Sequence, residues 1–256
     1  MKTYPEQRIA LITGGSRGLG KSMALHLAEH GIDVIITYRS RADEAQAVVE
    51  QIEALGRRAA KLPLDVSDSA SFAAFAQALR MELARTFKRE RFDFLVNNAG
   101  IGTHASFAET SEAQFDELMK IHLKAPFFLT QRLLPLIADG GRVLNVSSGL
   151  ARFSTPGYAA YAAMKGGVEV LTRYMAKELG ARKIAVNVIA PGAIETDFGG
   201  GLVRDNAAVN KAVAEQTALG RVGLPDDIGE AVAALLAPEG RWLTGQRIEF
   251  SGGMYL

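Results

Sequence analysis

A tyrosine and a lysine four residues apart are the first candidates for chemistry in this sequence. Tyr161 and Lys165 fall in a segment with helical character, and Ser154, Thr155 and Pro156 are typical of its start. Side chains four residues apart share one helix face, so these two would meet. An ammonium about 4 Å away favours a phenolate by roughly 4 kcal/mol at an effective dielectric of ~20, at most about three pKa units. The spacing therefore predicts that the pKa of Tyr161 falls towards neutrality, where a proton donor works best.

Such a pair also occurs by chance, so a second motif matters. Residues 8–13 form a short apolar run, followed by Thr13-Gly14-Gly15-Ser16-Arg17-Gly18-Leu19-Gly20 and a predicted helix over residues 21–29. Glycines allow a tight turn and close approach of the backbone to a phosphate, whose charge the helix N-terminus favours. The spacing differs from the usual Gly-x-Gly-x-x-Gly fingerprint, and such a loop can also be a plain turn. Its position between a first strand and a helix favours dinucleotide binding.

The end of the second predicted strand, over residues 33–38, indicates which dinucleotide. Many such sites carry an acidic residue there that holds the ribose hydroxyls. This chain instead has Tyr38-Arg39-Ser40-Arg41, and Asp33 lies at the opposite end of the strand. Arg39 and Arg17 could clamp a 2′-phosphate by charge-assisted hydrogen bonds, the alternative being two solvated surface arginines. The sequence therefore predicts NADP(H) as the cofactor.

The amino-acid composition limits the classes of protein to which the chain can belong. The chain has 256 residues, of which 48% are hydrophobic, enough for one substantial core in a single α/β domain. Its 29 basic and 28 acidic residues give a net charge of +1, so no global field would attract nucleic acid. It has no cysteine, which excludes disulfides and thiolate catalysis. Residues 1–10 lack the apolar core of a signal peptide, and no later run reaches membrane-spanning length, so we expect a soluble, cytoplasmic protein.

The rest of the chain alternates helical and strand patterns without an obvious linker or repeat. Helices are predicted over residues 42–55, 68–87, 111–137, 156–179, 206–216 and 225–236, and strands over residues 59–64, 92–96, 142–146, 184–190 and 246–250. Strands joined by helical crossovers predict a doubly wound, Rossmann-type parallel sheet with helices on both faces. Ligands bind such sheets beyond the carboxyl ends of the strands, and every candidate segment leaves one of those ends. Residues 198–201, Phe-Gly-Gly-Gly, are predicted to be mobile.

Together these motifs resemble the short-chain dehydrogenase/reductase family, in its single-domain branch of about this chain length. The resemblance covers nearly the whole chain and rests on five segments: Thr13-Gly14-x-x-x-Gly18-x-Gly20, Asn97-Asn98-Ala99-Gly100, Ser148, Tyr161-x-x-x-Lys165 and Pro191-Gly192. Ser148 stands thirteen residues before Tyr161, the spacing this family uses. Tyr158 is excluded as the matching tyrosine because Ala162 stands where its lysine would be.

The resemblance implies a carbonyl reductase that works reversibly on a small molecule, as a homotetramer or homodimer. Tyr161 would be the general acid, Lys165 would lower its pKa and bond the nicotinamide ribose, and Ser148 would hold the substrate oxygen. The glycine loop would carry the pyrophosphate, Asp65 and Val66 the adenine, Asn97 the adenosine side, and Ile194 and Thr196 the carboxamide. The full set of implied cofactor contacts is Gly14, Ser16, Arg17, Gly18, Leu19, Gly20, Tyr38, Arg39, Ser40, Asp65, Val66, Asn97, Ala99, Gly100, Tyr161, Lys165, Pro191, Gly192, Ile194 and Thr196. No metal is implied, because the nicotinamide carries the chemistry.

One position departs from the family pattern. Where the family usually has an Asn, whose backbone carbonyl is thought to hold a water linking the lysine to solvent, this chain has His122. Pro126 follows four residues later and has no N–H for that carbonyl, so we expect the proton relay to survive. Two alternatives are a titrating imidazole that shuttles protons itself and a residue that packs at a subunit contact.

The substrate is left open by the sequence. Residues 102–107, 149–158 and 198–216 are expected to wall its pocket, with a lid near residues 197–217. The apolar side chains of these walls are Phe153, Phe198, Leu202 and Val203. Three further side chains are candidate anchors for an acidic substrate, or are simply solvated: Arg152, Arg204 and His104. A ketone, an aldehyde, a quinone and a 3-oxoacyl thioester all fit. An alternative function is an NADP(H)-binding sensor or scaffold without turnover, against which the intact Ser148, Tyr161 and Lys165 argue.

Overall fold

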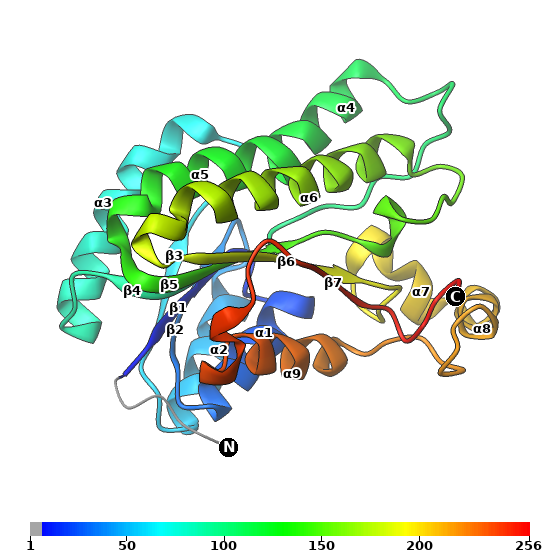
Figure 1. Ribbon diagram of the computed structural model, residues 1–256. Helices are drawn as coiled ribbons and strands as arrows, with labels where there is room; N and C mark the ends of the chain where they lie inside the picture. The colour runs from blue at the N-terminus through cyan, green and yellow to red at the C-terminus, as the bar shows by residue number, and fades with distance from the viewer. Residues whose placement is uncertain (1–6) are drawn as a thin grey trace.

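Seven short apolar segments form one parallel sheet (Figure 1). The computed structural model describes residues 7–256, apart from the side chains of residues 239 and 241. The strands are β1 (Ile9–Ile12), β2 (Asp33–Tyr38), β3 (Ala59–Pro63), β4 (Phe92–Asn97), β5 (Ile137–Val146), β6 (Ala185–Pro191) and β7 (Arg247–Phe250). Their order is β3-β2-β1-β4-β5-β6-β7, and all neighbours pair in parallel. The predicted doubly wound α/β fold is confirmed.

Helices cover both faces of the sheet, which is why most strands are apolar on both sides. Figure 1 shows α3 (Phe72–Glu82), α4 (Glu112–Met119), α5 (Ala125–Leu133) and α6 (Ala159–Leu179) on one face. The other face carries α1 (Gly18–Glu29), α2 (Ala42–Ala54) and α9 (Pro225–Leu235). Two short helices, α7 (Leu202–Asp205) and α8 (Ala207–Glu215), follow β6 and lie at the same end of the molecule as the C-terminus. Among the described residues, no helix has the length and apolar character that a membrane crossing needs.

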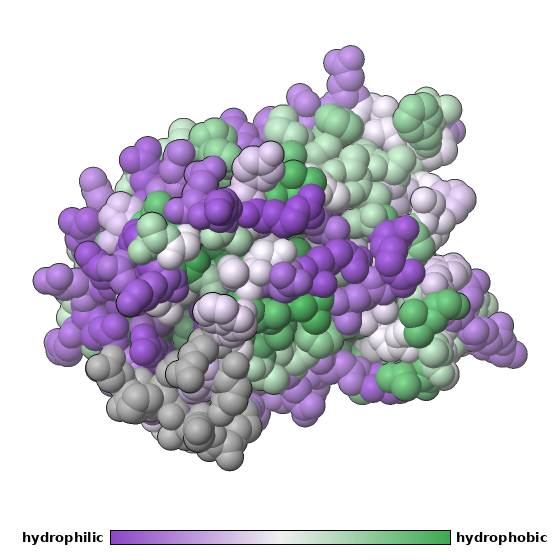
Figure 2. All heavy atoms as spheres, in the orientation of Figure 1, coloured by the Kyte–Doolittle hydropathy of each residue, from purple (hydrophilic) through white to green (hydrophobic). Residues whose placement is uncertain are grey.

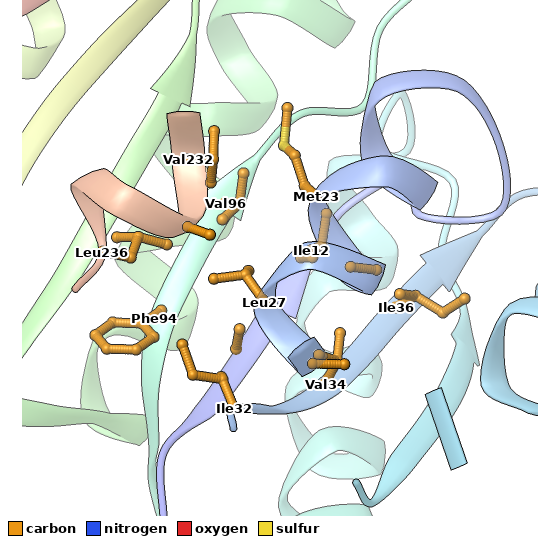
Figure 3. Close-up of a cluster of buried hydrophobic side chains, with 14 of the residues drawn as sticks. Ile12, Met23, Leu27, Ile32, Val34, Ile36, Phe94, Val96, Val232 and Leu236 are labelled. Atoms are coloured by element: carbon orange, nitrogen blue, oxygen red, sulfur yellow. The ribbon is translucent and has the colours of Figure 1, made fainter. Parts of the chain in front are cut away.

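The layer under α1 fixes the glycine-rich loop that precedes it. Figure 3 shows Met23 and Leu27 of α1 packed among strand residues such as Ile12 and Val96, with Val232 of α9 beside them. All five side chains are fully buried. Burial of each large apolar side chain contributes about 1.5–3 kcal/mol, so the start of α1 is held firmly against the sheet.

The opposite layer fixes α6, which carries Tyr161 and Lys165. On this face of the sheet, Ala176 of α6 belongs to a cluster of buried apolar side chains that also contains Leu129 of α5 and Val186 of β6. Tyr161 itself belongs to a third, smaller cluster with Leu118 and Met164. The catalytic candidates on α6 therefore stand on a rigid element rather than on a loop.

The start of α6 differs from the sequence prediction. A helix beginning at residues 154–156 was expected from the hydroxyl residues and the proline, but α6 begins at Ala159. Gly157 has a φ of +89°, a left-handed conformation that interrupts the helix and favours glycine. Its carbonyl accepts a hydrogen bond from the amide of Ala105, at 3.0 Å. A contact with a distant loop therefore overrides the local helix signal.

Two predicted long helices are broken in the structure. The segment expected over residues 111–137 consists of α4, a π-helical turn at Lys120–Lys124, α5 and a short 3₁₀ turn, and its last residue already belongs to β5. Ile137 pairs with Phe92 in parallel, ahead of a register shift that precedes the regular pairing of β4 and β5. The segment over residues 68–87 divides similarly into a 3₁₀ turn at Ser69–Ser71, α3 and a π-helical turn at Leu83–Phe87. Most other boundaries lie within one or two residues of the prediction, although α1 begins three residues early.

Candidate active site

The carboxyl ends of β1, β4, β5 and β6 bring the candidate segments together. Thr13, after β1, accepts hydrogen bonds on its hydroxyl from the backbone amides of Asn98 and Ala99, both at 3.0 Å. The Asn98 side chain donates in turn to the carbonyls of Thr13 and Gly14. Segments more than eighty residues apart are thus fixed side by side. Asn98, given no separate role by the sequence, thus helps to hold the glycine loop in place, together with Thr37, which accepts hydrogen bonds from the amides of Gly14 and Gly15.

The glycine loop has the form of a phosphate cradle. A Cβ on Gly20 would lie 2.2 Å from the carbonyl oxygen of Gly14, and Gly14 has a φ of +67°, so neither position accepts a side chain. Arg17, the N-cap residue of α1, makes no capping hydrogen bond with its side chain, and the first turn contains no acidic residue. The first N–H groups of α1 have no side-chain cap and can bind an anion. These residues fit the pyrophosphate of a dinucleotide.

The side chain of Asn97 is occupied within the protein. Its amide donates to Thr130, at 3.0 Å, and to Asn145, at 2.8 Å. Asn145 donates to Thr172 of α6, at 2.9 Å. This buried amide network ties β4 and β5 to α5 and α6. The predicted contact of Asn97 with the adenosine side of the cofactor would therefore have to come from its backbone.

The three catalytic candidates come together at the carboxyl end of β5. Tyr161 and Lys165 are both buried on α6, and the Lys165 Nζ lies 5.4 Å from the centre of the Tyr161 ring. The Lys165 ammonium donates to the carbonyl of Val146, at 2.7 Å. Ser148 hydrogen bonds with the Tyr161 hydroxyl, an interaction that lowers the pKa of Tyr161. The geometry matches the set expected from the spacing of thirteen residues.

The pKa of Tyr161 does not follow the sequence prediction. Burial raises it above its ordinary value, the neighbouring Tyr158 phenol raises it further, and only the bond with Ser148 opposes them. Burial also lowers the pKa of Lys165, from 10.5 to about 7. Desolvation disfavours the charged form of each group, and the Lys165 ammonium is directed at a carbonyl of β5. The predicted fall towards neutrality is therefore wrong for the protein without its cofactor, in which Tyr161 is a protonated phenol.

His122 packs against the ring of Tyr161. The two rings meet edge to face, with centres 5.0 Å apart, and the imidazole Nε2 donates to the carbonyl of Ile101, at 2.8 Å. Burial and the charge of Lys165 hold the pKa of His122 well below 6.5, so the imidazole is neutral at pH 7. Within the described part of the chain, its buried Nδ1 has no hydrogen-bond partner. These facts disfavour the alternative in which His122 shuttles protons by titrating near neutrality.

The candidates for the 2′-phosphate clamp are separated. Arg39 is exposed at the end of β2, and its charge contributes to the lowered pKa of Asp65, which also accepts two hydrogen bonds from Ser67. Arg17 instead pairs with Asp197, at 3.0 Å. Arg39 therefore stands by the residues predicted to hold the adenine, while Arg17 bridges the glycine loop to the segment after β6. Asp33 is buried at the start of β2 with Arg57 and Arg58, as its position predicted.

Ion pairs connect the start of the predicted lid, residues 197–205, to the glycine loop and within itself. Asp197 pairs with Arg204 as well as with Arg17, and Arg204 also pairs with Asp205. Thr196, from the same segment, lies 3.7 Å from the position a Cβ would take on Gly18. The segment after β6 thus lies against the glycine loop.

An ion-pair chain behind Ser148 was not found from the sequence. Ser147 donates its hydroxyl to Glu169, at 2.7 Å, and Arg247 of β7 donates to the same carboxylate oxygen, at 2.7 Å. Arg247 also pairs with Glu249, which pairs with Arg152. Glu169 stands four residues after Lys165 on the same helix. That spacing places both side chains on one helix face, and it was the sequence signal that could have identified Glu169. This series of ion pairs connects the loop after β5 to α6 and to β7, the strand at the edge of the sheet.

A surface hollow of about 470 Å³ lies at the opposite end of the sheet. Its lining includes Arg142, Ala185 and Trp242. Ala185 is the first residue of β6, so this hollow faces the amino ends of the strands. Parallel α/β sheets bind ligands at the carboxyl ends, and we assign the hollow no part in the chemistry.

Comparisons with known proteins identify the family of this chain. A family model described as enoyl-(acyl carrier protein) reductase matches residues 14–255. A hydroxynaphthalene reductase-like protein of Metarhizium brunneum is 35% identical, over 96% of this chain and 94% of its own length. A 3-oxoacyl-[acyl-carrier-protein] reductase of Staphylococcus aureus is 36% identical, over 96% of this chain and 98% of its own. The solved structure of the angucycline C-6 ketoreductase LanV with bound NADP has a TM-score of 0.92 and 35% identity, over 97% of this chain and 95% of that one. The chain belongs to the short-chain dehydrogenase/reductase family.

Proposed function

We propose that this protein reduces a carbonyl group to an alcohol with NADPH, and that Ser148, Tyr161 and Lys165 carry the reaction. The observation that supports the proposal most is the convergence of these three side chains beside a glycine loop suited to a dinucleotide. Relatives that match nearly the whole chain are reductases, and one related structure holds NADP. NADPH supplies the hydride that reaches the carbonyl carbon.

Each of the three residues has one task in this reaction. Tyr161 is protonated because burial raises its pKa, so its hydroxyl can donate a proton to the substrate oxygen. Ser148 holds that oxygen through its own hydroxyl. The ammonium of Lys165, close to the Tyr161 ring, stabilises the phenolate that remains after the transfer. The proton then returns to Tyr161 from solvent through Lys165.

The cofactor would lie across the carboxyl edge of the sheet. Gly14, Ser16, Arg17, Gly18, Leu19 and Gly20 are suited to hold its pyrophosphate, because their backbone surrounds the N-terminus of α1. Asp65 and Val66 are placed for the adenine, and Ile194 and Thr196 for the carboxamide. Arg39 supports the 2′-phosphate from the end of β2.

A panel of carbonyl compounds tests this function. We expect NADPH oxidation with at least one of a ketone, an aldehyde, a quinone and a 3-oxoacyl thioester. The reductase relatives favour this outcome over the alternative of a sensor without turnover. Tight NADPH binding combined with no turnover across the panel would favour the sensor instead.

The proton relay gives a prediction at His122. We propose that the backbone carbonyl of His122, rather than its imidazole, serves the relay, because the proline at residue 126 has no N–H to occupy it. His122→Asn should therefore stay within about tenfold of the wild-type turnover, roughly 1.4 kcal/mol of barrier. Pro126→Ala should do more damage, because it restores a donor for that carbonyl. Steady-state turnover of both variants, with circular dichroism to check folding, decides the matter; a loss of about 10³ in folded His122→Asn would make the imidazole the relay.

We further propose that the protein is a homotetramer in the cytoplasm, the second point in keeping with a cysteine-free chain. The apolar side chains of Phe127 and Phe128 on α5, and of Val170 and Tyr174 on α6, are 43% to 66% exposed in the single chain. A Cβ on Gly166 of α6 would meet no atom of the described residues within 4 Å, whereas a Cβ on Gly167 would lie 3.2 Å from the side chain of Leu123. A close approach of a second copy along α6 would explain Gly166.

Light scattering at micromolar concentration checks the oligomer. We expect a mass of four chains, or of two if only the surface of α5 and α6 is shared. Apolar patches of this kind are typical of protein interfaces. A monomer would contradict the proposal.

A further inference from the structure

Aromatic rings gather around Tyr161, and four of them rest against glycines. In each pair a Cβ on the glycine would come within 2.8 Å or less of a ring atom: Gly100 with His122, Gly102 with Phe198, Gly149 with Phe153, and Gly157 with His104. Real Cβ atoms do not approach other atoms so closely. The four glycines come from the loops after β4 and β5, which are the loops that surround the catalytic tyrosine.

Several of these rings contact a tyrosine near the reacting group. The Phe198 ring centre lies 5.8 Å from that of Tyr161, and His104 meets Tyr158 edge to face at 5.1 Å. Tyr158 is the N-cap residue of α6, three residues before Tyr161. Phe198 and His104 thus pack directly against the backbone of Gly102 and Gly157 on one side. The surface next to the reacting hydroxyl is therefore lined by aromatic rings.

Part of this ring surface is open to a ligand. Phe198 is 44% exposed and Tyr255, whose ring lies 4.7 Å from that of Phe153, is also 44% exposed. In Figure 2 green, apolar atoms stand on the surface at the end of the molecule where Figure 1 places α7, α8 and the C-terminus. His122, by contrast, is buried behind Tyr161, so it does not belong to the exposed set.

The two arginines expected to anchor an acidic substrate are already paired. Arg152 makes two hydrogen bonds to the carboxylate of Glu249, at 2.8 and 2.7 Å. Arg204 is held by Asp197 and Asp205. A carboxylate or phosphate on the substrate would have to displace these acids, whereas a neutral aromatic molecule would not. Charge and ring placement thus favour the same kind of ligand.

We infer that the substrate is a neutral, planar ketone with an aromatic ring system, which stacks on Phe198 and Tyr158 while its carbonyl oxygen meets Tyr161 and Ser148. The inference rests on the proposed carbonyl reduction and specifies its substrate class. Aromatic pairs add interaction beyond the area they bury, and they depend on ring orientation. The flat faces of these rings suit a planar aromatic molecule better than an acyl chain, which has no ring to stack on them.

A matched pair of ketones tests the inference on the full-length protein. β-Tetralone and β-decalone share a bicyclic skeleton and a similar, unconjugated carbonyl, but only the first has an aromatic ring. We expect kcat/KM for β-tetralone to exceed that for β-decalone by about tenfold or more, the effect of one or two ring contacts. Phe198→Leu should reduce this ratio to within about threefold, while Phe198→Tyr, which keeps the ring, should preserve it.

Phe128→Leu is the matched control, because Phe128 is 43% exposed but lies on α5 beside Ser69 and Phe72. It should leave the ratio unchanged. Equal kcat/KM for the two ketones, or faster reduction of an acetoacetyl thioester than of β-tetralone, would overturn the inference and leave carbonyl reduction standing. Failure to reduce any compound of the wider carbonyl panel would overturn the proposed function as well.

Discussion

Replacing Tyr161 by phenylalanine should lower the turnover of carbonyl reduction by about 10²–10⁴-fold, the range expected for loss of a general acid. The change removes one hydroxyl and keeps the ring, so the contacts of Tyr161 with His122 and Phe198 survive. NADPH binding should remain close to that of the wild type. The effect belongs to the chemical step, because the lost group is the one that donates the proton.

The measurement combines steady-state kinetics with NADPH binding by nicotinamide fluorescence. Tyr174→Phe is a suitable control, because Tyr174 lies on the same helix and is 66% exposed. It should retain nearly all activity. A Tyr161→Phe protein that kept near-full turnover would show that the pairing with Lys165 is incidental and that another group donates the proton.

NADPH should bind this protein much more tightly than NADH, and Arg39 should account for most of the difference. Hydrogen bonds to a charged group contribute about 1.5–3 kcal/mol, so Arg39→Ala should weaken NADPH binding by about 10–100-fold. The variant should leave NADH binding nearly unchanged, because NADH has no 2′-phosphate. Both dissociation constants can be measured by nicotinamide fluorescence at one fixed salt concentration, since exposed charges are screened by salt.

Arg41→Ala controls for a general loss of positive charge. Arg41 is also exposed near the end of β2, but it pairs with Glu44 at the start of α2. Its loss should affect both cofactors slightly and alike. Equal affinities of the wild type for the two cofactors, or equal weakening of both by Arg39→Ala, would contradict the clamp.

The sequence predicted the sheet well because the strands of a doubly wound fold are short apolar runs between turns. The range expected for β2 agrees with the structure at both ends, and the other strands differ by single residues at one or both ends, except β5, which begins five residues before the predicted range of 142–146. The proximity of Tyr161 and Lys165 was also predictable, since both lie on one helix and local spacing determines their relation. What escaped prediction depends on contacts between distant segments. The start of α6 is set by the bond between Gly157 and the loop after β4, which no local pattern reveals.

The electrostatics of the site escaped prediction for a related reason. Spacing along a helix indicates that Lys165 and Tyr161 are neighbours, but not that both are buried or that the ammonium is directed at Val146. Burial changes the sign of the expected shift of the Tyr161 pKa. The contacts between rings and glycines could not be predicted either, because they join distant segments: Phe198 and Gly102 are almost a hundred residues apart and meet only in the folded chain.

The π-helical turn at Lys120–Lys124 has a consequence for how this chain tolerates insertions and deletions. A π turn is in effect an α-helix that holds one extra residue, and successive residues of an α-helix are about 100° apart around its axis. Deleting a single residue there would restore α geometry and rotate one flank of the helix against the other by about that angle. Either His122 would leave Tyr161, or the apolar face of α5 would leave the sheet. Point substitutions can vary this segment, but its length cannot change by one without loss of either the site or the core.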